Sequence, residues 1–293
     1  MMLLSRLLKI DLHLIRSSKD FSTLRMNPSL FDSLEKPQTS VGRFFAGPVS
    51  KTFSNMDHQN QVVMDMGCGP GNITTKLILP RFPNLKKVLA IDRLPDMIEF
   101  AKKNHPHPKV EYSVGDISQW SSVEKWKGQI SNFFSIHVFH WLTDQQQGFR
   151  NVHQLLQPGG YAAFFFILQS TFFDMCSEIE NRLKWSEYLK DVNSSIPLSH
   201  TENYQTEYYT DMVTEIGFKI EHYNGDMKTD VFSSYGLYKD FFSSVCVLLP
   251  YIPLELQEEF KNDILNTLLK RNRRINGLPT HAGRMLELIA RKI

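Results

Sequence analysis

The stretch Gln61-Val-Val-Met-Asp65-Met-Gly67-Cys-Gly69-Pro-Gly71 decides the fold. A short apolar run ends in an acid, a glycine-rich turn follows, and residues 72–79 have a helical pattern that Pro80 is expected to stop. Glycines allow a tight turn from strand to helix and let a ligand approach the backbone closely. The stretch therefore predicts a ligand-binding loop at the end of a buried strand.

The spacing of the glycines argues against a dinucleotide site. The Gly-x-Gly-x-x-Gly pattern requires a glycine at position 72, where this chain has Asn72. Asp92 and Asp116 follow later strand-like runs, as Asp65 ends the first one. Because the carboxyl ends of parallel strands meet at one edge of a sheet, the three acids are expected to line one crevice. Taken singly, each acid could equally be a helix N-cap.

Apolar runs alternate with helical patterns from Val62 onward, which predicts βαβ units, a parallel sheet and an α/β fold. The last apolar segment, residues 284–291, suits an edge strand. Neither an internal repeat nor a low-complexity linker is present, so residues 26–293 are expected to form one domain. Strands are expected at 61–65, 87–92, 110–114, 130–136, 161–168 and 218–223, and helices at 72–79, 94–103, 144–156, 172–189, 206–216, 235–248 and 253–271.

The composition is that of an ordinary globular protein, with 293 residues, 42% hydrophobic and 22% charged. Its 33 basic and 31 acidic side chains leave a net charge of +2, which argues against a protein built to hold nucleic acid. Three cysteines far apart predict no disulfide framework and favour a reducing compartment. No apolar run approaches the ~20 residues of a transmembrane helix. No His or Cys cluster has the spacing of metal ligands.

The first 25 residues are basic, amphipathic and poor in acids. Such a segment is typical of a mitochondrial presequence. Alternatively, Met26 is the authentic start and residues 1–25 are an extension from a misassigned start. The first interpretation predicts a mitochondrial protein and the second a cytoplasmic one.

The segment from Asp65 to Gly71 resembles motif I of the class I S-adenosylmethionine-dependent methyltransferases. That resemblance implies a Rossmann-like fold, with a mostly parallel seven-stranded sheet, helices on both faces and a helical substrate cover. It also implies S-adenosyl-L-methionine as the cofactor, with Asp65 supporting its methionine amino group. The remaining cofactor residues would be Gly67, Cys68, Gly69 and Gly71 in the loop, Asp92 and Arg93 at the ribose, and Asp116 and Ile117 at the adenine.

Later segments narrow the family. The runs 134–141 and 155–160, with 228–235 and 249–253, resemble the insect juvenile hormone acid O-methyltransferase family, over about residues 27–293. This implies that the chain esterifies the carboxylate of a small lipophilic acid, such as farnesoic or juvenile hormone acid. Gln38 and Trp141 would hold that carboxylate. His137 and His140 could orient groups in the site or, as neutral imidazoles, donate a hydrogen bond. As alternatives, Trp141 is a core aromatic and Gln38 an ordinary surface residue. The chain departs from the family at Pro70 and Phe139, which bears on substrate range.

A carboxylic acid is already ionised at neutral pH, so its methylation needs no general base. Two other functions remain open: a methyltransferase acting at a hydroxyl, nitrogen or carbon, and a non-catalytic homologue that only binds the cofactor. The aromatic content, 12% with 21 Phe, can serve the core or an apolar substrate tunnel. The aromatics in question are Phe164, Phe165, Phe166, Phe172, Phe173, Trp185 and Tyr188.

Overall fold

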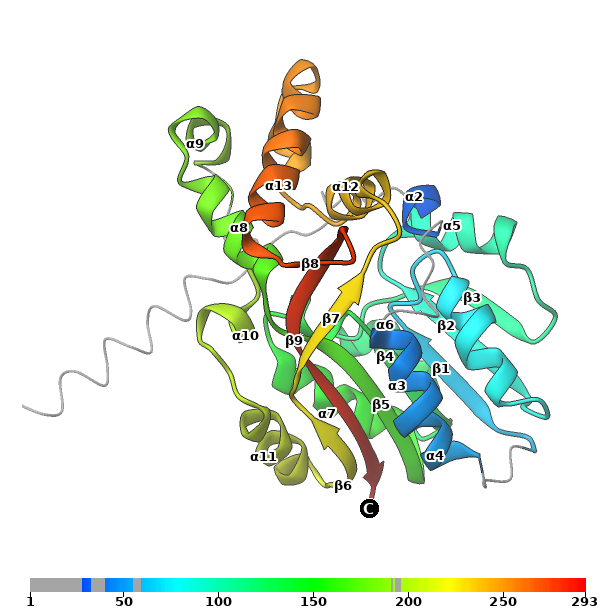
Figure 1. Ribbon diagram of the computed structural model, residues 1–293. Helices are drawn as coiled ribbons and strands as arrows, with labels where there is room; N and C mark the ends of the chain where they lie inside the picture. Colours follow the sequence, from blue (N-terminus) through cyan, green and yellow to red (C-terminus); the bar gives the residue numbers. More distant parts are fainter. Residues whose placement is uncertain (1–27, 33–39, 55–58, 191, 193–195) are drawn as a thin grey trace, which may run out of the picture.

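The computed structural model describes residues 28–32, 40–54, 59–190, 192 and 196–293 (Figure 1). Its centre is a nine-stranded sheet whose main path runs β3-β2-β1-β4-β5-β9-β6. Residues 1–25, and with them the predicted extension, lie outside the described part of the chain. The strands are β1 Val62–Met66, β2 Lys87–Asp92, β3 Val110–Val114, β4 Ile130–Ile136, β5 Leu156–Ser170, β6 Phe218–Asn224, β7 Met227–Val231, β8 Arg274–Ile275 and β9 Leu278–Lys292.

The first five strands pair in parallel, as predicted, and β9 pairs antiparallel to β5. The expected count of seven strands matches the main path, to which β7 and β8 add further pairings with β9. The prediction of an edge strand at 284–291 is wrong, because β9 has β5 on one side and β6 and β7 on the other. Residues at the C-terminal end therefore complete the interior of the sheet.

Helices lie on both faces of the sheet and over one of its ends (Figure 1). The predicted helix at 172–189 is two helices, and the predicted helix at 235–248 ends at Ser244. After the glycine loop the chain continues past Pro80 as a 3-10 turn, because a proline is tolerated in the first turn of a helix. The helical segments are α2 Pro28–Asp32, α3 Ser40–Phe44, η2 Phe45–Val49, α4 Ser50–Phe53, η3 Thr74–Ile78, η4 Leu79–Arg81, α5 Pro95–Asn104, α6 Trp120–Val123, η5 Glu124–Trp126, η6 Phe139–Trp141, α7 Gln145–Leu155, α8 Thr171–Glu180, α9 Leu183–Leu189, α10 Leu198–Thr201, α11 Thr206–Ile216, α12 Tyr235–Ser244, η7 Leu249–Tyr251, η8 Leu254–Leu256 and α13 Gln257–Arg271.

The alternation of side chains along β5 divides the core into two layers. Phe164 and Phe166 point to the face covered by α7 and α11, and Phe165 points to the face covered by α3, η2 and α4. All three rings are fully buried, as the two-residue period of a strand requires when both faces are covered. These three aromatics thus belong to the core. Among the described residues, no helix is both long and apolar enough to cross a membrane.

A separate helical layer covers the carboxyl end of the parallel strands. It consists of α8, α9, α12 and α13, and α8 begins directly where β5 ends (Figure 1). Its own apolar cluster includes Phe173, Trp185, Phe242 and Phe260. This layer is the helical cover that the resemblance implied, and it encloses the edge of the sheet at which the predicted acids lie.

Candidate active site

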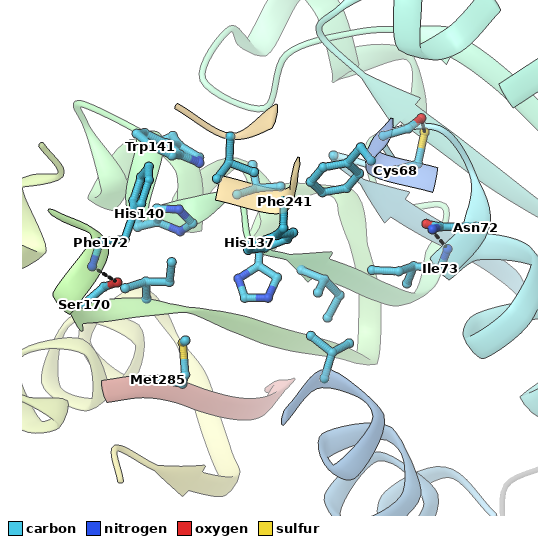
Figure 2. A pocket seen from close by; sticks show the side chains of 18 of the residues that line it. Cys68, Asn72, Ile73, His137, His140, Trp141, Ser170, Phe172, Phe241 and Met285 are labelled. Atoms are coloured by element: carbon cyan, nitrogen blue, oxygen red, sulfur yellow. Dashed lines mark hydrogen bonds between the residues drawn. The ribbon is translucent and has the colours of Figure 1, made fainter. Parts of the chain in front are cut away.

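One cavity, of about 400 Å³, lies between the strand ends and the helical cover. At one end it is lined by the loop after β1 and by the ends of β2 and β3. At the other end it is lined by α8, α12, β7 and β9. Figure 2 shows Cys68 and Asn72 at the first end, His137 in the middle, and His140, Trp141 and Phe172 at the second. The cavity therefore has two regions that can hold two different molecules.

The glycine loop forms the first end of the cavity. Gly67 and Gly69 line it, both with positive φ (+80° and +54°), a conformation that side chains rarely adopt. The amides of Gly67 and Cys68 donate to the carbonyl of Ile91, at 2.7 and 3.0 Å, which ties the loop to the end of β2. Gly71 (φ +93°) does not line the cavity and packs against Tyr112. The loop thus exposes the backbone of Gly67 and Gly69 to the cavity.

Asp92 lines the cavity at the end of β2 and is buried. Its Oδ2 accepts the amide of Gly69 at 2.9 Å, and its Oδ1 accepts the amide of Leu94 at 2.9 Å. Burial raises the pKa of its carboxyl, against the opposing effect of these amides and of Arg93. Each carboxylate oxygen has further lone pairs, so both can still accept a hydroxyl from a ligand. Arg93, beside it, also lines the cavity, and burial lowers the pKa of its guanidinium.

Asp116 and Ile117 line the cavity after β3. Oδ1 of Asp116 accepts both the amide and the hydroxyl of Ser118, at 2.8 and 2.7 Å, which is the local capping that an aspartate alone would provide. The carbonyl of Ile117 accepts Nδ2 of the buried Asn151 at 2.7 Å. The loop is therefore fixed, with one carboxylate oxygen of Asp116 used in the turn.

Asp65, unlike Asp92 and Asp116, lies outside the cavity lining. It is 1% exposed, and its Oδ2 accepts the hydroxyl of Thr74 at 2.6 Å. This bond joins the end of β1 to the helical segment after the glycine loop. Its predicted contact with the methionine amino group stays a prediction.

His137, which directly follows β4, is one of the two histidines that the sequence offered for orienting groups in the site. It has a φ of +60°, uncommon for a residue other than glycine, and its amide donates to the carbonyl of Phe165 at 2.7 Å. Its ring faces the middle of the cavity (Figure 2). Such conformations cost free energy and are concentrated at functional sites. The sequence signal for this residue was its place, with His140, in the segment before Trp141.

His140 and Trp141 lie side by side in η6, with ring centroids 4.8 Å apart, and both line the cavity (Figure 2). His140 is 2% exposed, and its Nδ1 has no hydrogen-bond partner within the described part of the chain. Burial, with the nearby His137, holds the pKa of its imidazole well below the usual value, so the ring is neutral. Phe139 is buried in the sheet core against Phe149, so this departure from the family pattern lies outside the cavity lining.

The second end of the cavity is mostly apolar. Phe172 and Phe173 line it, as the sequence allowed, together with Phe241 of α12 and Met285 of β9, which were not predicted. Trp185 is buried outside the cavity lining, with its ring centroid 5.0 Å from that of Phe260. Tyr188 is 41% exposed. Gln38 lies outside the described residues. The aromatics of the cover are thus divided between the cover's own core and the cavity wall.

Comparison with known proteins gives a match to a family model over part of the chain. Residues 64–164 match the family model described as a methyltransferase domain. The chain carries a methyltransferase domain. Its cofactor is S-adenosyl-L-methionine. The first end of the cavity fits that group, because the bare backbone of Gly67 and Gly69 and the carboxylates of Asp92 and Asp116 line it.

Curated relatives of this methyltransferase include juvenile hormone acid O-methyltransferases. The protein from Drosophila melanogaster is 22% identical over 83% of this chain and 83% of its own length. That from Bombyx mori is 25% identical over 70% of this chain and 73% of its own length. A candidate methyltransferase from Bacillus halodurans has the same fold, with a TM-score of 0.53, 16% identity, and coverage of 86% of this chain and 98% of that one.

Proposed function

We propose that this methyltransferase esterifies the carboxylate of a small lipophilic acid, of the kind of farnesoic or juvenile hormone acid. The observation that carries the proposal is the continuity of one cavity from the glycine loop to an aromatic-lined end. Bound cofactor supplies an electrophilic methyl group. The chain's own residues then have to bind an acid with its tail among the aromatics and its carboxylate facing the loop.

Two histidines that line the cavity favour an acceptor that is already charged. His140 and His281 both line it, and burial lowers the pKa of both imidazoles. A histidine with a lowered pKa is a weak base, so it would remove a proton from a hydroxyl or an ammonium group poorly. A carboxylate needs only to be oriented and shielded from water, and orientation alone can supply ~7–11 kcal/mol of a barrier.

Trp141 and His140 are the groups we assign to the carboxylate. Nε1–H of Trp141 donates no hydrogen bond to any described residue, and Nδ1 of His140 is likewise unpartnered there. A neutral imidazole protonated at Nδ1 and an indole N–H are both donors, and donors to a carboxylate make the stronger class of hydrogen bond. Gln38 is assigned to the same carboxylate on the family resemblance alone.

The names of relatives support an acid as substrate. Besides the two insect proteins, a malonyl-[acyl-carrier protein] O-methyltransferase 1 from Ilyobacter polytropus is 33% identical over 43% of this chain and 46% of its own length. Malonyl and juvenile hormone acid groups each carry a free carboxylate. The apolar lining of this cavity favours the lipophilic one of the two.

The proposal is tested by methyl transfer from labelled cofactor to a panel of fatty and terpenoid acids, with hydroxyl, amine and carbon acceptors alongside. We expect esters of the acids only. Trp141→Phe should lower kcat/KM about 10- to 100-fold, the loss of one hydrogen bond to a charged group, while cofactor affinity stays the same. Transfer to none of the acids by a protein that still binds cofactor would refute the proposal.

Trp185→Phe is the matched control. It removes an indole of α9 that lies outside the cavity lining and whose Nε1 donates to Oδ2 of Asp263 at 2.8 Å. We expect reduced stability with kcat/KM within about two-fold of the wild type. Asp92→Ala tests the cofactor end separately, and unchanged cofactor affinity in that variant would overturn the assignment of the ribose site.

A further inference from the structure

The apolar end of the cavity contains one buried polar pair that the proposed reaction does not use. Oγ of Ser170, at the end of β5, and Nε2 of His281, in β9, are 2.8 Å apart. Ser170 is 3% exposed and His281 8% exposed, yet both line the cavity. Around them the wall is aromatic, with the ring of Phe242 centred 5.0 Å from that of His281. A polar pair in such a wall costs free energy unless its hydrogen bonds are satisfied.

The hydrogen bonds of the pair leave one position open. Oγ of Ser170 already accepts the amide of Phe172 at 3.1 Å, as the N-cap of α8. The pair has two hydrogens, one on the hydroxyl and one on the neutral imidazole, and a single one lies between Oγ and Nε2. If the hydroxyl donates to Nε2, the imidazole hydrogen is on Nδ1. If Nε2–H donates to Oγ, the hydroxyl hydrogen is free and Nδ1 is an acceptor.

In both arrangements one hydrogen remains for another molecule. Nδ1 of His281 has no hydrogen-bond partner among the described residues. The backbone on both sides of the pair is held firmly: the amide of Ala282 donates to Oδ1 of the buried Asn272 at 3.0 Å, and the amide of Ser170 donates to Nδ1 of His200 at 3.3 Å. The open position is therefore in a fixed place and is not a consequence of a loose segment.

Ser170 and the glycine loop lie on opposite sides of His137, which follows Ile136 in the chain (Figure 2). Ile136, the last residue of β4, pairs with Phe165, and Ser170 is the last residue of the same strand, β5. Five residues of strand span about 16 Å at ~3.3 Å per residue. A group that meets Ser170 and His281 is thus on the tail of a molecule whose other end reaches the glycine loop.

Resting on the proposed function, we propose that Ser170 and His281 form a second recognition site, for a neutral oxygen group on the tail of the lipophilic acid. A hydroxyl, carbonyl or ether oxygen fits, because the pair can donate to it in either tautomer. A second carboxylate does not fit, because the pair is neutral and the wall around it is apolar. The preferred acids are then oxygenated ones, and a plain hydrocarbon tail leaves the pair unsatisfied.

The test compares matched acids on the full chain. Saturated acids of increasing length are assayed with and without a terminal hydroxyl, and kcat/KM is measured for each member of a pair. We expect the wild type to prefer the hydroxylated acid by about ten-fold at the length that reaches the pair, the value of one hydrogen bond. His281→Phe should lose this preference and keep or raise activity on the plain acid. His281→Asn, which places a polar group near the position of Nδ1, should restore part of it.

Phe241→Leu is the control, because it enlarges the apolar wall without changing the pair and should affect both acids of a matched pair equally. Cofactor titration verifies that each variant is folded. A wild type that prefers the plain acid at every length, or a preference that survives in His281→Phe, overturns the inference. Those results are distinct from failure of the proposed function, in which neither acid of any pair is methylated.

Discussion

Gly67→Ala tests whether the glycine loop has the shape that the cofactor site requires. At this position φ is +80°, and an added Cβ would lie 2.0 Å from Cγ2 of Val138. Two costs add. An L-residue in a left-handed conformation costs about 1–2 kcal/mol, and overpacking of a filled site costs about 1–3 kcal/mol. We therefore expect a loss of about 2–5 kcal/mol in the free energy of unfolding.

A second substitution separates the two costs. In a Val138→Ala background the Cγ2 atom is gone and the nearest Val138 atom is Cβ, at 3.2 Å from the added methyl. In that background Gly67→Ala should lower the free energy of unfolding by the conformational cost alone, about 1–2 kcal/mol. The double-mutant cycle of the two substitutions should therefore give a coupling free energy of about 1–3 kcal/mol. Urea unfolding measures all four proteins, and titration with S-adenosyl-L-methionine measures the affinity, which we expect to fall in the single variant.

Two other glycines serve as controls. Gly128 has φ +68° with nothing within 4 Å of an added Cβ, so Gly128→Ala should show the conformational cost alone. Gly47 has open space around it and no positive φ, so Gly47→Ala should be neutral or stabilise by up to ~1 kcal/mol. The reasoning is refuted if Gly67→Ala is no more destabilising than Gly128→Ala, or if removing the Val138 methyls changes nothing.

Three further predictions concern stability and reactivity. Burial lowers the pKa of His281 from 6.5 to about 4, so between these pH values only the unfolded chain binds the proton. Acidification from pH 6.5 to 4 should therefore destabilise the wild type by about 3 kcal/mol more than His281→Phe, at ~1.36 kcal/mol per pH unit, in urea unfolding at each pH. Asp230→Ala should cost about 1–3 kcal/mol by the same measurement, because its carboxylate accepts the amide and hydroxyl of Ser40 at 2.6 and 2.9 Å; an unchanged midpoint would contradict this. Cys176 and Cys246 are buried outside the cavity lining, so a thiol reagent should label these two only after denaturation, and their rapid labelling in the native protein would disprove their placement.

The parallel half of the fold was readable from the sequence because its signals are local. β1 to β4 were predicted within a residue or two, since each is a short apolar run bounded by turn residues. Asp92 and Asp116 were brought to one cavity by the same logic, because parallel strands place their carboxyl ends at one edge. Local patterns were enough wherever neighbours in the sheet are also neighbours in the chain.

For Asp65 and Gly71, the motif alone does not say which neighbours the residue contacts. Both belong to the glycine motif, yet Asp65 accepts a hydrogen bond from Thr74 behind the loop and Gly71 faces Tyr112. The motif constrains residue types for two reasons, ligand contact and the packing of the turn itself, and a sequence does not separate the two. Only the direction of each side chain does so.

The second polar site could not be found from the chain because it depends on pairing between distant strands. Ser170 precedes a helix and looks like an N-cap, which it is, and His281 is a lone histidine in an apolar run. They meet because β9 inserts antiparallel between β5 and β6, and because the register of β5 and β9 shifts between Ile167 and Gln169. An irregularity of one residue reverses which face of a strand a side chain occupies. The contact that we assign to the substrate tail therefore depends on this register shift. The residue pattern along one strand does not tell which residues of the other strand it pairs with.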